Sequence, residues 1–144
     1  MKKLTRYEIG FLEGVIDSDG CLTSYRLKPN KSETHRRNRQ SFKLRLSIAN
    51  NSIELLNKIQ DIIGESGSIV VKHDNRYKTT SYELKYSHTV LRWLLPQLRL
   101  VVKEDRRVIF IQVLELIKQS NRFANSDIDD RHSKIEQLLD EVGL

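Results

Sequence analysis

Two aspartates separated by one residue, Asp17 and Asp19, lie just before Gly20 in the first part of the chain. Carboxylate oxygens are ligands that Mg²⁺ prefers, and this ion completes its coordination with water and phosphate oxygens. The run is therefore compatible with a cation site facing a phosphodiester, and also with an ordinary turn at the end of a helix. An EF-hand calcium loop is excluded, because the glycine comes too early and Lys28 lies in the region where the bidentate glutamate belongs.

The helix that carries these carboxylates begins at a capping box. In Thr5-Arg6-Tyr7-Glu8, the threonine hydroxyl can accept a hydrogen bond from the backbone N–H of Glu8, and the glutamate can reach back to Thr5. We expect a helix from about Arg6 to Asp17, ended by Gly20.

Gly10 and Gly14 are four residues apart on one face of this helix, with Asp17 one turn further on. A glycine inside a helix destabilises it by roughly 1 kcal/mol relative to alanine. We expect the close approach of a second helix to offset this loss. The alternative is that the two glycines are merely tolerated.

The rest of the chain alternates between strand and helix patterns. The clearest strand runs from Ser41 to Ala49, where every second residue from Phe42 is apolar. The other expected strands are 21–28 (with a bulge near Ser24), 68–72 and 81–86, and the other expected helices are 53–63, 89–95, 105–119 and 130–142. In the helix at 105–119 we expect the buried side to lie near Val108, Ile109, Ile111, Gln112, Leu114 and Leu116.

This order predicts one α+β domain over residues 1–144, with a core at about 5–119 and a C-terminal helix at about 130–142. Helices should cover the apolar face of an antiparallel sheet and leave its polar face to solvent or a partner. The formal net charge is +6, and eight basic residues stand against one acid between Arg26 and Arg45. A basic segment that flanks and enters a strand favours a polyanionic partner, most simply nucleic acid.

The string Phe-Leu-Glu-Gly-Val-Ile-Asp-Ser-Asp-Gly at residues 11–20 resembles the motif that names the LAGLIDADG homing endonucleases. Six positions match the motif, namely Leu12, Gly14, Ile16, Asp17, Asp19 and Gly20. Glu13 is the clearest departure, because the motif has alanine there. The resemblance extends to an αββαββα order of elements, and it covers the chain to about Gln119.

The resemblance implies a homodimer that cuts both strands of a long, nearly palindromic DNA site with Mg²⁺, or with Mn²⁺ or Ca²⁺ in the same position. Asp19 and the backbone carbonyl of Ser18 would then hold the metal. Asn50 would help to order water in the active site, together with a lysine for which Lys103 is the nearest candidate and Arg106 the alternative. Gly10, Gly14 and Asp17 would form the dimer interface, and Asp17 would be mainly structural.

The predicted DNA-binding residues lie in the basic segment and on the polar sheet face. They are Thr23, Arg26, Lys28, Arg36, Arg37, Arg39, Ser41, Lys43, Arg45, Ser47, Lys72, Glu83 and Lys85.

Three other functions remain open at this point. The same fold could serve as a DNA-binding regulator without catalysis or as an RNA-binding intron maturase, and charge alone would also suit a structural RNA binder. The single cysteine, Cys21, rules out an internal disulfide. With no apolar stretch that resembles a signal peptide or a membrane span, we expect a reducing intracellular compartment, in a prokaryotic cytoplasm or an organelle, and no membrane partner.

Overall fold

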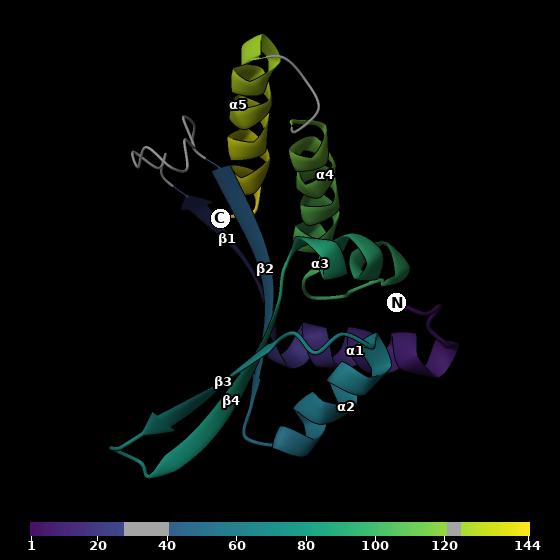
Figure 1. Ribbon diagram of the computed structural model, residues 1–144, viewed down its shortest axis with the longest axis vertical. Coiled ribbons are helices and arrows are strands. Elements are labelled where there is room, and N and C mark those ends of the chain that lie inside the picture. The colour runs from purple at the N-terminus through teal and green to yellow at the C-terminus, as the bar shows by residue number, and fades with distance from the viewer. Residues whose placement is uncertain (28–40, 121–124) are drawn as a thin grey trace.

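The alternation of apolar and polar residues along the strands decides the architecture. In this computed structural model, which describes residues 1–27, 41–120 and 125–144, four antiparallel strands form a sheet in the order β1-β2-β4-β3. Helices cover one face of that sheet, and the β3–β4 hairpin extends away from them (Figure 1). The elements are α1 (Arg6–Asp19), β1 (Gly20–Leu27), β2 (Ser41–Asn50), α2 (Ile53–Ile63), β3 (Ser68–Asp74), β4 (Thr79–Tyr86), α3 (His88–Leu94), the short 3₁₀ helix η1 (Leu95–Gln97), α4 (Glu104–Ser120) and α5 (Asn125–Glu141).

β2 confirms the strongest strand prediction. Its apolar residues Phe42, Leu44, Leu46 and Ile48 are buried under the helices, while the residues between them face the uncovered side. In the register of each strand pair, core-facing residues of one strand lie opposite core-facing residues of the next. The division into two faces therefore continues across the sheet. The sheet therefore has one apolar face in the core and one polar face available to a partner.

The capping box also forms as predicted. The backbone N–H of Glu8 donates to Thr5 Oγ1 at 3.2 Å, and Glu8 Oε1 accepts from the backbone N–H of Thr5 at 3.0 Å. The helix that starts there continues two residues beyond the expected end, so that Asp19 is its last residue.

Gly20 joins α1 directly to β1, but not through the left-handed conformation that commonly ends a helix. Its φ and ψ are −79° and 151°, which is ordinary extended backbone. A Cβ at this position would lie 2.7 Å from the carbonyl oxygen of Ile16 and 2.9 Å from its Cα. Glycine is therefore needed for close packing of the strand against the helix end.

One local expectation is wrong and another holds only in part. β1 pairs with β2 residue by residue from Gly20 to Leu27, so there is no bulge at Ser24. On α4 Ile109 and Leu114 are buried as expected, but the buried side is rotated toward Phe110 and Val113, and Val108 is 39% exposed.

The rotation of α4 follows from its first turn. Arg107 is buried and forms an ion pair with Glu104 at 2.6 Å, and its Nη1 donates to the carbonyl of Leu95 at 2.8 Å. This anchor turns Phe110, one turn later, into the core.

Among the described residues, no helix is long and apolar enough to cross a membrane.

His88 completes the hydrogen bonding of β2 where β4 ends. β2 pairs with β4 only from Leu46 onward, and the backbone N–H of Leu44 instead donates to His88 Nε2 at 2.9 Å. Burial lowers the pKa of His88, and the positive charges of Arg92 and Lys43 lower it further. The neutral imidazole is the form that can accept this hydrogen bond.

We expect the stability of the chain to fall as the pH drops below about 6.5, the pKa of an unfolded histidine. The unfolded chain takes up a proton there before the folded chain does, so the contribution of neutral His88 is lost as pH falls toward its lowered pKa. Urea unfolding from pH 5 to 8 measures this dependence. His88→Leu should lose it, and should also lower the free energy of unfolding at pH 8 by about 1–3 kcal/mol, because Leu44 N–H is left unpaired.

His88→Gln is the matched control, since a glutamine oxygen can accept the same hydrogen bond without titrating. It should retain more stability than His88→Leu at pH 8. A wild-type pH dependence that survives unchanged in both variants would assign the effect to other groups.

Candidate active site

Asp19 lies at the carboxyl end of α1, on the surface, where the helix passes into the sheet. Its Oδ2 accepts a hydrogen bond from Asn50 Nδ2 at 2.8 Å. Asn50 is the last residue of β2, and its Oδ1 accepts from the backbone N–H of Ser52 at 2.8 Å. Because that backbone donor fixes which end of the amide is the oxygen, the Asn50 NH₂ group is directed at Asp19. Asn50, which the family resemblance predicts to help order water in the active site, therefore lies beside the predicted metal ligand.

Asp17 has a different environment from Asp19. Its Oδ2 accepts from the backbone N–H of Val101 at 2.7 Å, and its Oδ1 accepts from Val102 and Lys103, both at 3.1 Å. Desolvation raises the pKa of Asp17, but the three backbone donors outweigh it, and the net pKa is lowered. Both oxygens of Asp17 therefore accept hydrogen bonds from its own chain, as suits a structural residue.

Lys103 reaches the same end of α1. Its Nζ donates to the backbone carbonyl of Ile16 at 2.9 Å, which also accepts from the backbone N–H of Gly20, and to the carbonyl of Asp17 in the last turn of the helix. A cation at the carboxyl end of a helix also interacts favourably with the helix dipole. Arg106, the alternative candidate, instead donates to the carbonyl of Leu22 in β1 at 3.3 Å. Lys103 is therefore the basic residue held at the end of the helix that carries Asp19.

The donor atoms at this helix end suit a hard cation. Asp19 supplies a carboxylate, and its Oδ1 accepts no hydrogen bond from the described residues. The Ser18 hydroxyl donates to the carbonyls of Gly14 and Val15, at 2.9 and 3.2 Å, and is thereby turned back along the helix, away from the end that carries Asp19. Among the described residues, no group of three Asp, Glu, His or Cys side chains gathers to hold a metal. One chain thus fits Mg²⁺ as a partial ligand set, with room for water and phosphate oxygens.

The uncovered face of the sheet carries the cations predicted to meet DNA. Lys43 is exposed on β2, and the guanidinium of Arg45 lies 4.5 Å from the centre of the Tyr25 ring on β1, with Nη1 3.2 Å from the tyrosine hydroxyl. Thr23, Ser41 and Ser47 lie on the same face by strand register.

The face continues onto β3 and β4 with Lys72, Glu83 and Lys85. Glu83 forms an ion pair with Lys72 and lies 4.0 Å from Lys85. The hydrogen bond from Lys72 lowers the pKa of Glu83 in spite of the opposing effect of burial. This carboxylate therefore stays ionised, and it orients the two lysines on the sheet face.

Arg26 does not belong to this face. It pairs with Phe42, whose side chain is in the core, and its guanidinium binds Glu136 of α5 through two nitrogens, at 2.6–2.9 Å. The strand alternation places every even-numbered residue of β1 on the helix side, so the DNA-contact prediction for Arg26 is corrected to an ion pair that joins β1 to α5. Four other predicted contacts, Lys28, Arg36, Arg37 and Arg39, lie outside the described residues.

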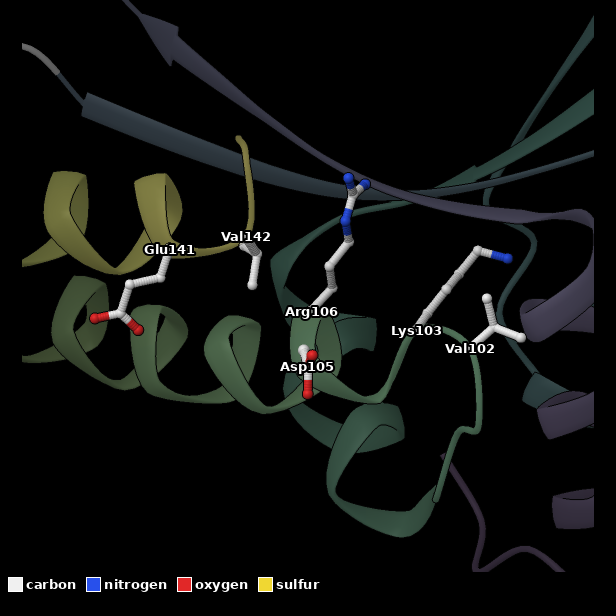
Figure 2. Close-up of a pocket in the computed structure, with 6 residues that line it drawn as sticks. All are labelled: Val102, Lys103, Asp105, Arg106, Glu141 and Val142. Atoms are coloured by element: carbon white, nitrogen blue, oxygen red, sulfur yellow. The ribbon is translucent and has the colours of Figure 1, made fainter.

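A pocket of about 560 Å³ is lined by Lys103 of the candidate site but not by Asp19 or Asn50. Its lining residues come from the start of α4 and the end of the chain: Val102, Lys103, Asp105, Arg106, Glu141 and Val142. Figure 2 shows the side chain of Arg106 extending from α4 toward the sheet and that of Lys103 extending from the segment just before α4. Asp19 does not line this pocket. The candidate reactive carboxylate is thus on an open surface, as a duplex polymer would require.

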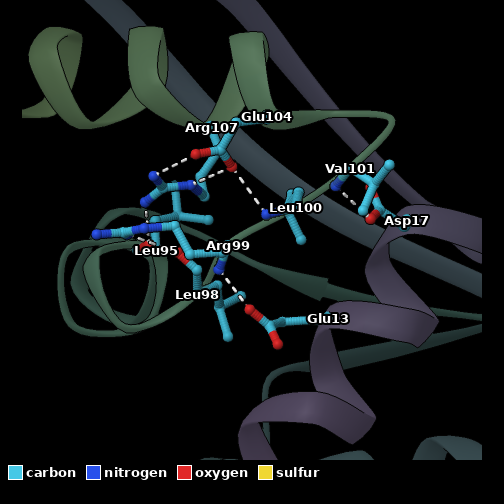
Figure 3. A network of polar contacts seen from close by, with 9 residues as sticks. All are labelled: Glu13, Asp17, Leu95, Leu98, Arg99, Leu100, Val101, Glu104 and Arg107. Carbon is cyan, nitrogen blue, oxygen red and sulfur yellow. Dashed lines mark hydrogen bonds and ion pairs between the residues drawn. The ribbon is translucent and has the colours of Figure 1, made fainter.

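Two features of α1 were not recognised in the sequence. Glu13 accepts a hydrogen bond from the backbone N–H of Arg99 at 2.5 Å (Figure 3). Its position one turn before Asp17 was the signal that could have indicated a shared role. The second feature is Tyr7, which is 69% exposed, stacks on Phe11 and extends the exposed stripe of Gly10 and Gly14 that the sequence had indicated.

Comparisons with known proteins agree with the motif and the fold. A family model described as LAGLIDADG endonuclease matches residues 12–104. None of the curated protein sequences matches this chain. Many solved structures do, and the examples that follow have 17–20% sequence identity, so they bear on the fold.

The homing endonuclease I-CvuI, in complex with the I-CreI target, is 19% identical over 96% of this chain and 81% of its own, with a TM-score of 0.65. The archaeal intron-encoded homing endonuclease I-Vdi141I, complexed with DNA, is 17% identical over 94% of this chain and 84% of its own, with a TM-score of 0.67. The meganuclease I-SmaMI, bound to uncleavable DNA, is 20% identical over 93% of this chain but only 44% of its own, with a TM-score of 0.68. Because the family model spans well over half of the sequence and the fold agrees, this chain belongs to the LAGLIDADG family of homing endonucleases.

Proposed function

We propose that this chain is a site-specific endonuclease that cuts double-stranded DNA as a homodimer, by Mg²⁺-dependent hydrolysis of one phosphodiester bond in each strand. The observation that carries the proposal is the exposed Asp19 carboxylate, oriented by Asn50 at the edge of a cationic sheet face. A regulator or maturase would have no need of this carboxylate, and no feature of the described residues favours those functions over cleavage.

The residues of this chain divide the work in the proposed reaction. Asp19 and the Ser18 carbonyl would hold the cation, which when bound supplies Lewis acidity toward the phosphodiester. Asn50 fixes the orientation of the carboxylate, and its own amide is fixed by Ser52. Lys103 keeps a positive charge at the end of α1, where negative charge would otherwise gather from the helix carbonyls and the substrate.

A second copy of the chain would bind the exposed stripe of α1. Apart from the backbone of α1 itself, a Cβ built on Gly10 or Gly14 would meet no atom of the described residues within 4 Å, so no contact in that part of the chain accounts for the two glycines. The exposed ring of Tyr7 flanks them, and Val101 and Val102, held at the end of α1 by Asp17, are 89% and 76% exposed. Helix packing of two such stripes would bury this apolar surface and bring the two Asp19 residues toward one two-fold axis.

The length of β2 supports a long target site. Ten residues of strand span about 33 Å, which corresponds to about ten base pairs at the ~3.4 Å rise of duplex DNA. Two protomers related by a two-fold axis would then cover about twenty base pairs. The pseudo-palindromic target follows from the same symmetry.

Asp19→Asn should abolish cleavage and leave DNA binding nearly intact. The variant removes a metal ligand whose contribution is several kcal/mol, so cleavage should fall by at least about a hundredfold, while no phosphate contact is lost. The test incubates purified protein with a randomised duplex library and Mg²⁺, sequences the cut ends, and then measures cleavage and binding on the selected site. Asp61→Asn, at an exposed position on α2, is the control and should cut normally.

Cleavage by Asp19→Asn at the rate of the wild type would exclude Asp19 as the metal ligand. Specific DNA or RNA binding by the wild type, without any cleavage, would instead favour the regulator or the maturase.

Asp17→Asn should act on folding more than on chemistry. An amide nitrogen would replace one carboxylate oxygen and turn a donor toward the backbone N–H groups at 101–103, which should lower the free energy of unfolding by about 2 kcal/mol. Urea unfolding at pH 7.5 measures this loss. An Asp17→Asn protein with wild-type stability and no activity would contradict this division of roles between the two aspartates.

Gly14→Leu should split the dimer without harming the fold of the chain. The new side chain meets open space within its own chain, but it would project into the interface between two α1 helices. Light scattering should give a mass near twice 16.9 kDa for the wild type and near 16.9 kDa for the variant, with little change in thermal stability. Asn57→Leu, at an exposed position on α2, controls for the added apolar surface. A wild-type chain that is monomeric and protects only half a site would overturn the proposed dimer.

A further inference from the structure

The segment that joins η1 to α4 is held almost entirely by carboxylates. Five consecutive backbone N–H groups, those of residues 99 to 103, each donate to a carboxylate oxygen and not to another backbone carbonyl (Figure 3 draws three of these contacts). Asp17 accepts the last three of them, Glu104 accepts from Leu100 at 2.8 Å, and Glu13 accepts from Arg99. The path of this segment therefore depends on three side chains.

These three carboxylates come from two different helices. Glu13 and Asp17 are one turn apart on α1, whereas Glu104 begins α4 and is itself fixed by Arg107, at 2.7 and 2.6 Å. The ion pair with Arg107 lowers the pKa of Glu104 to about 2. The segment is thus bound by side chains of both α1 and α4. Glu13 is the residue of α1 that binds its first residue, Arg99.

The far end of the same segment is Lys103. Its ammonium reaches the carbonyls of Ile16 and Asp17, three and two residues before Asp19. The place of the ammonium depends on the backbone that leads into it, and that backbone is held on α1 at two points, Arg99 and 101–103. With one point removed, the segment could pivot about Asp17.

We propose that Glu13 is a positioning residue, which sets the place of the Lys103 ammonium at the active-site end of α1 by holding the backbone of Arg99. The catalytic consequence of this inference rests on the proposed nuclease function. The hydrogen bond from Arg99 to Glu13 does not depend on that function. Alanine, which the family motif has at this position, carries no acceptor. Glutamate at this position therefore supplies an acceptor for the backbone N–H of Arg99 that the alanine of the motif lacks.

Steady-state cleavage tests the catalytic consequence with Glu13→Ala and Glu13→Gln. Misplacing a catalytic group by a fraction of an ångström to 1 Å lowers rates by up to about a hundredfold, so kcat of Glu13→Ala should fall by about ten- to a hundredfold. KM and the Kd for DNA should stay within about twofold, because Glu13 is not on the DNA face. Glu13→Gln retains an acceptor oxygen and should restore most of kcat. Glu115→Ala removes an equal charge from the middle of α4 and should cut normally.

Lys103→Met supplies the second half of the test. If Glu13 acts through Lys103, the double variant Glu13→Ala/Lys103→Met should have the same kcat as Lys103→Met alone. Three outcomes would each overturn the proposal. The double variant could show the combined losses of the two single variants, Glu13→Ala could keep the kcat of the wild type, or Glu13→Gln could fail to restore kcat.

Amide hydrogen exchange of ¹⁵N-labelled protein tests the geometry without any cleavage. In the wild type the Arg99 amide should exchange slowly. Glu13→Ala should accelerate it at least about tenfold, together with the amides at 101–103, while the amides of α2 keep their rates. If the wild type cuts no DNA, the nuclease proposal fails, and this exchange pattern alone decides whether Glu13 positions the segment. Unchanged exchange at residues 99–103 would overturn it.

Discussion

The position of Asp19 depends on the hydrogen bonds that tie Asp17 to the segment before α4. Asp17 lies two residues before Asp19 on the last turn of α1, and α1 passes into β1 at Gly20 without an intervening loop. Whatever fixes Asp17 therefore also fixes the carboxylate at the helix end. Desolvation of Asp17 opposes this arrangement, and three backbone donors overcome it. In this motif Asp17 thus has a structural role, and Asp19, two residues later, is held in place while its carboxylate stays exposed.

The candidate site is an exposed helix end and not a cavity. Asp19 has only Asn50 as a side-chain partner among the described residues, and the nearby pocket is lined by other side chains. The proposed duplex DNA substrate would account for this openness, since its phosphate oxygens can fill remaining coordination positions of a cation. The incomplete ligand set and the open glycine stripe of α1 then support the same conclusion, that a second chain completes the proposed enzyme.

The sequence was sufficient to predict the order of elements, the capping box and the two faces of β2, whereas the contact between Asp19 and Asn50 is visible only in the structure. The predicted features depend on local chemistry or on strict periodicity, both of which are visible in one chain. The rotation of α4 was not predictable in the same way, because it depends on the buried Arg107 and its partners Glu104 and Leu95. Such contacts join residues whose spatial relation is decided by tertiary packing.

Arg26 and Arg45 show how a basic residue acquires its role in this sheet. Both are arginines on neighbouring strands in the same basic stretch of sequence, but strand alternation sends Arg26 to Glu136 on the helix side and Arg45 to Tyr25 on the open face. Charge composition alone could not separate them, whereas register does. Glu13 follows the same logic on a helix: its place one turn before Asp17 aims it at the segment that Asp17 already holds. For Arg26, Arg45 and Glu13 alike, the face of the strand or helix on which the residue lies decides which groups it contacts.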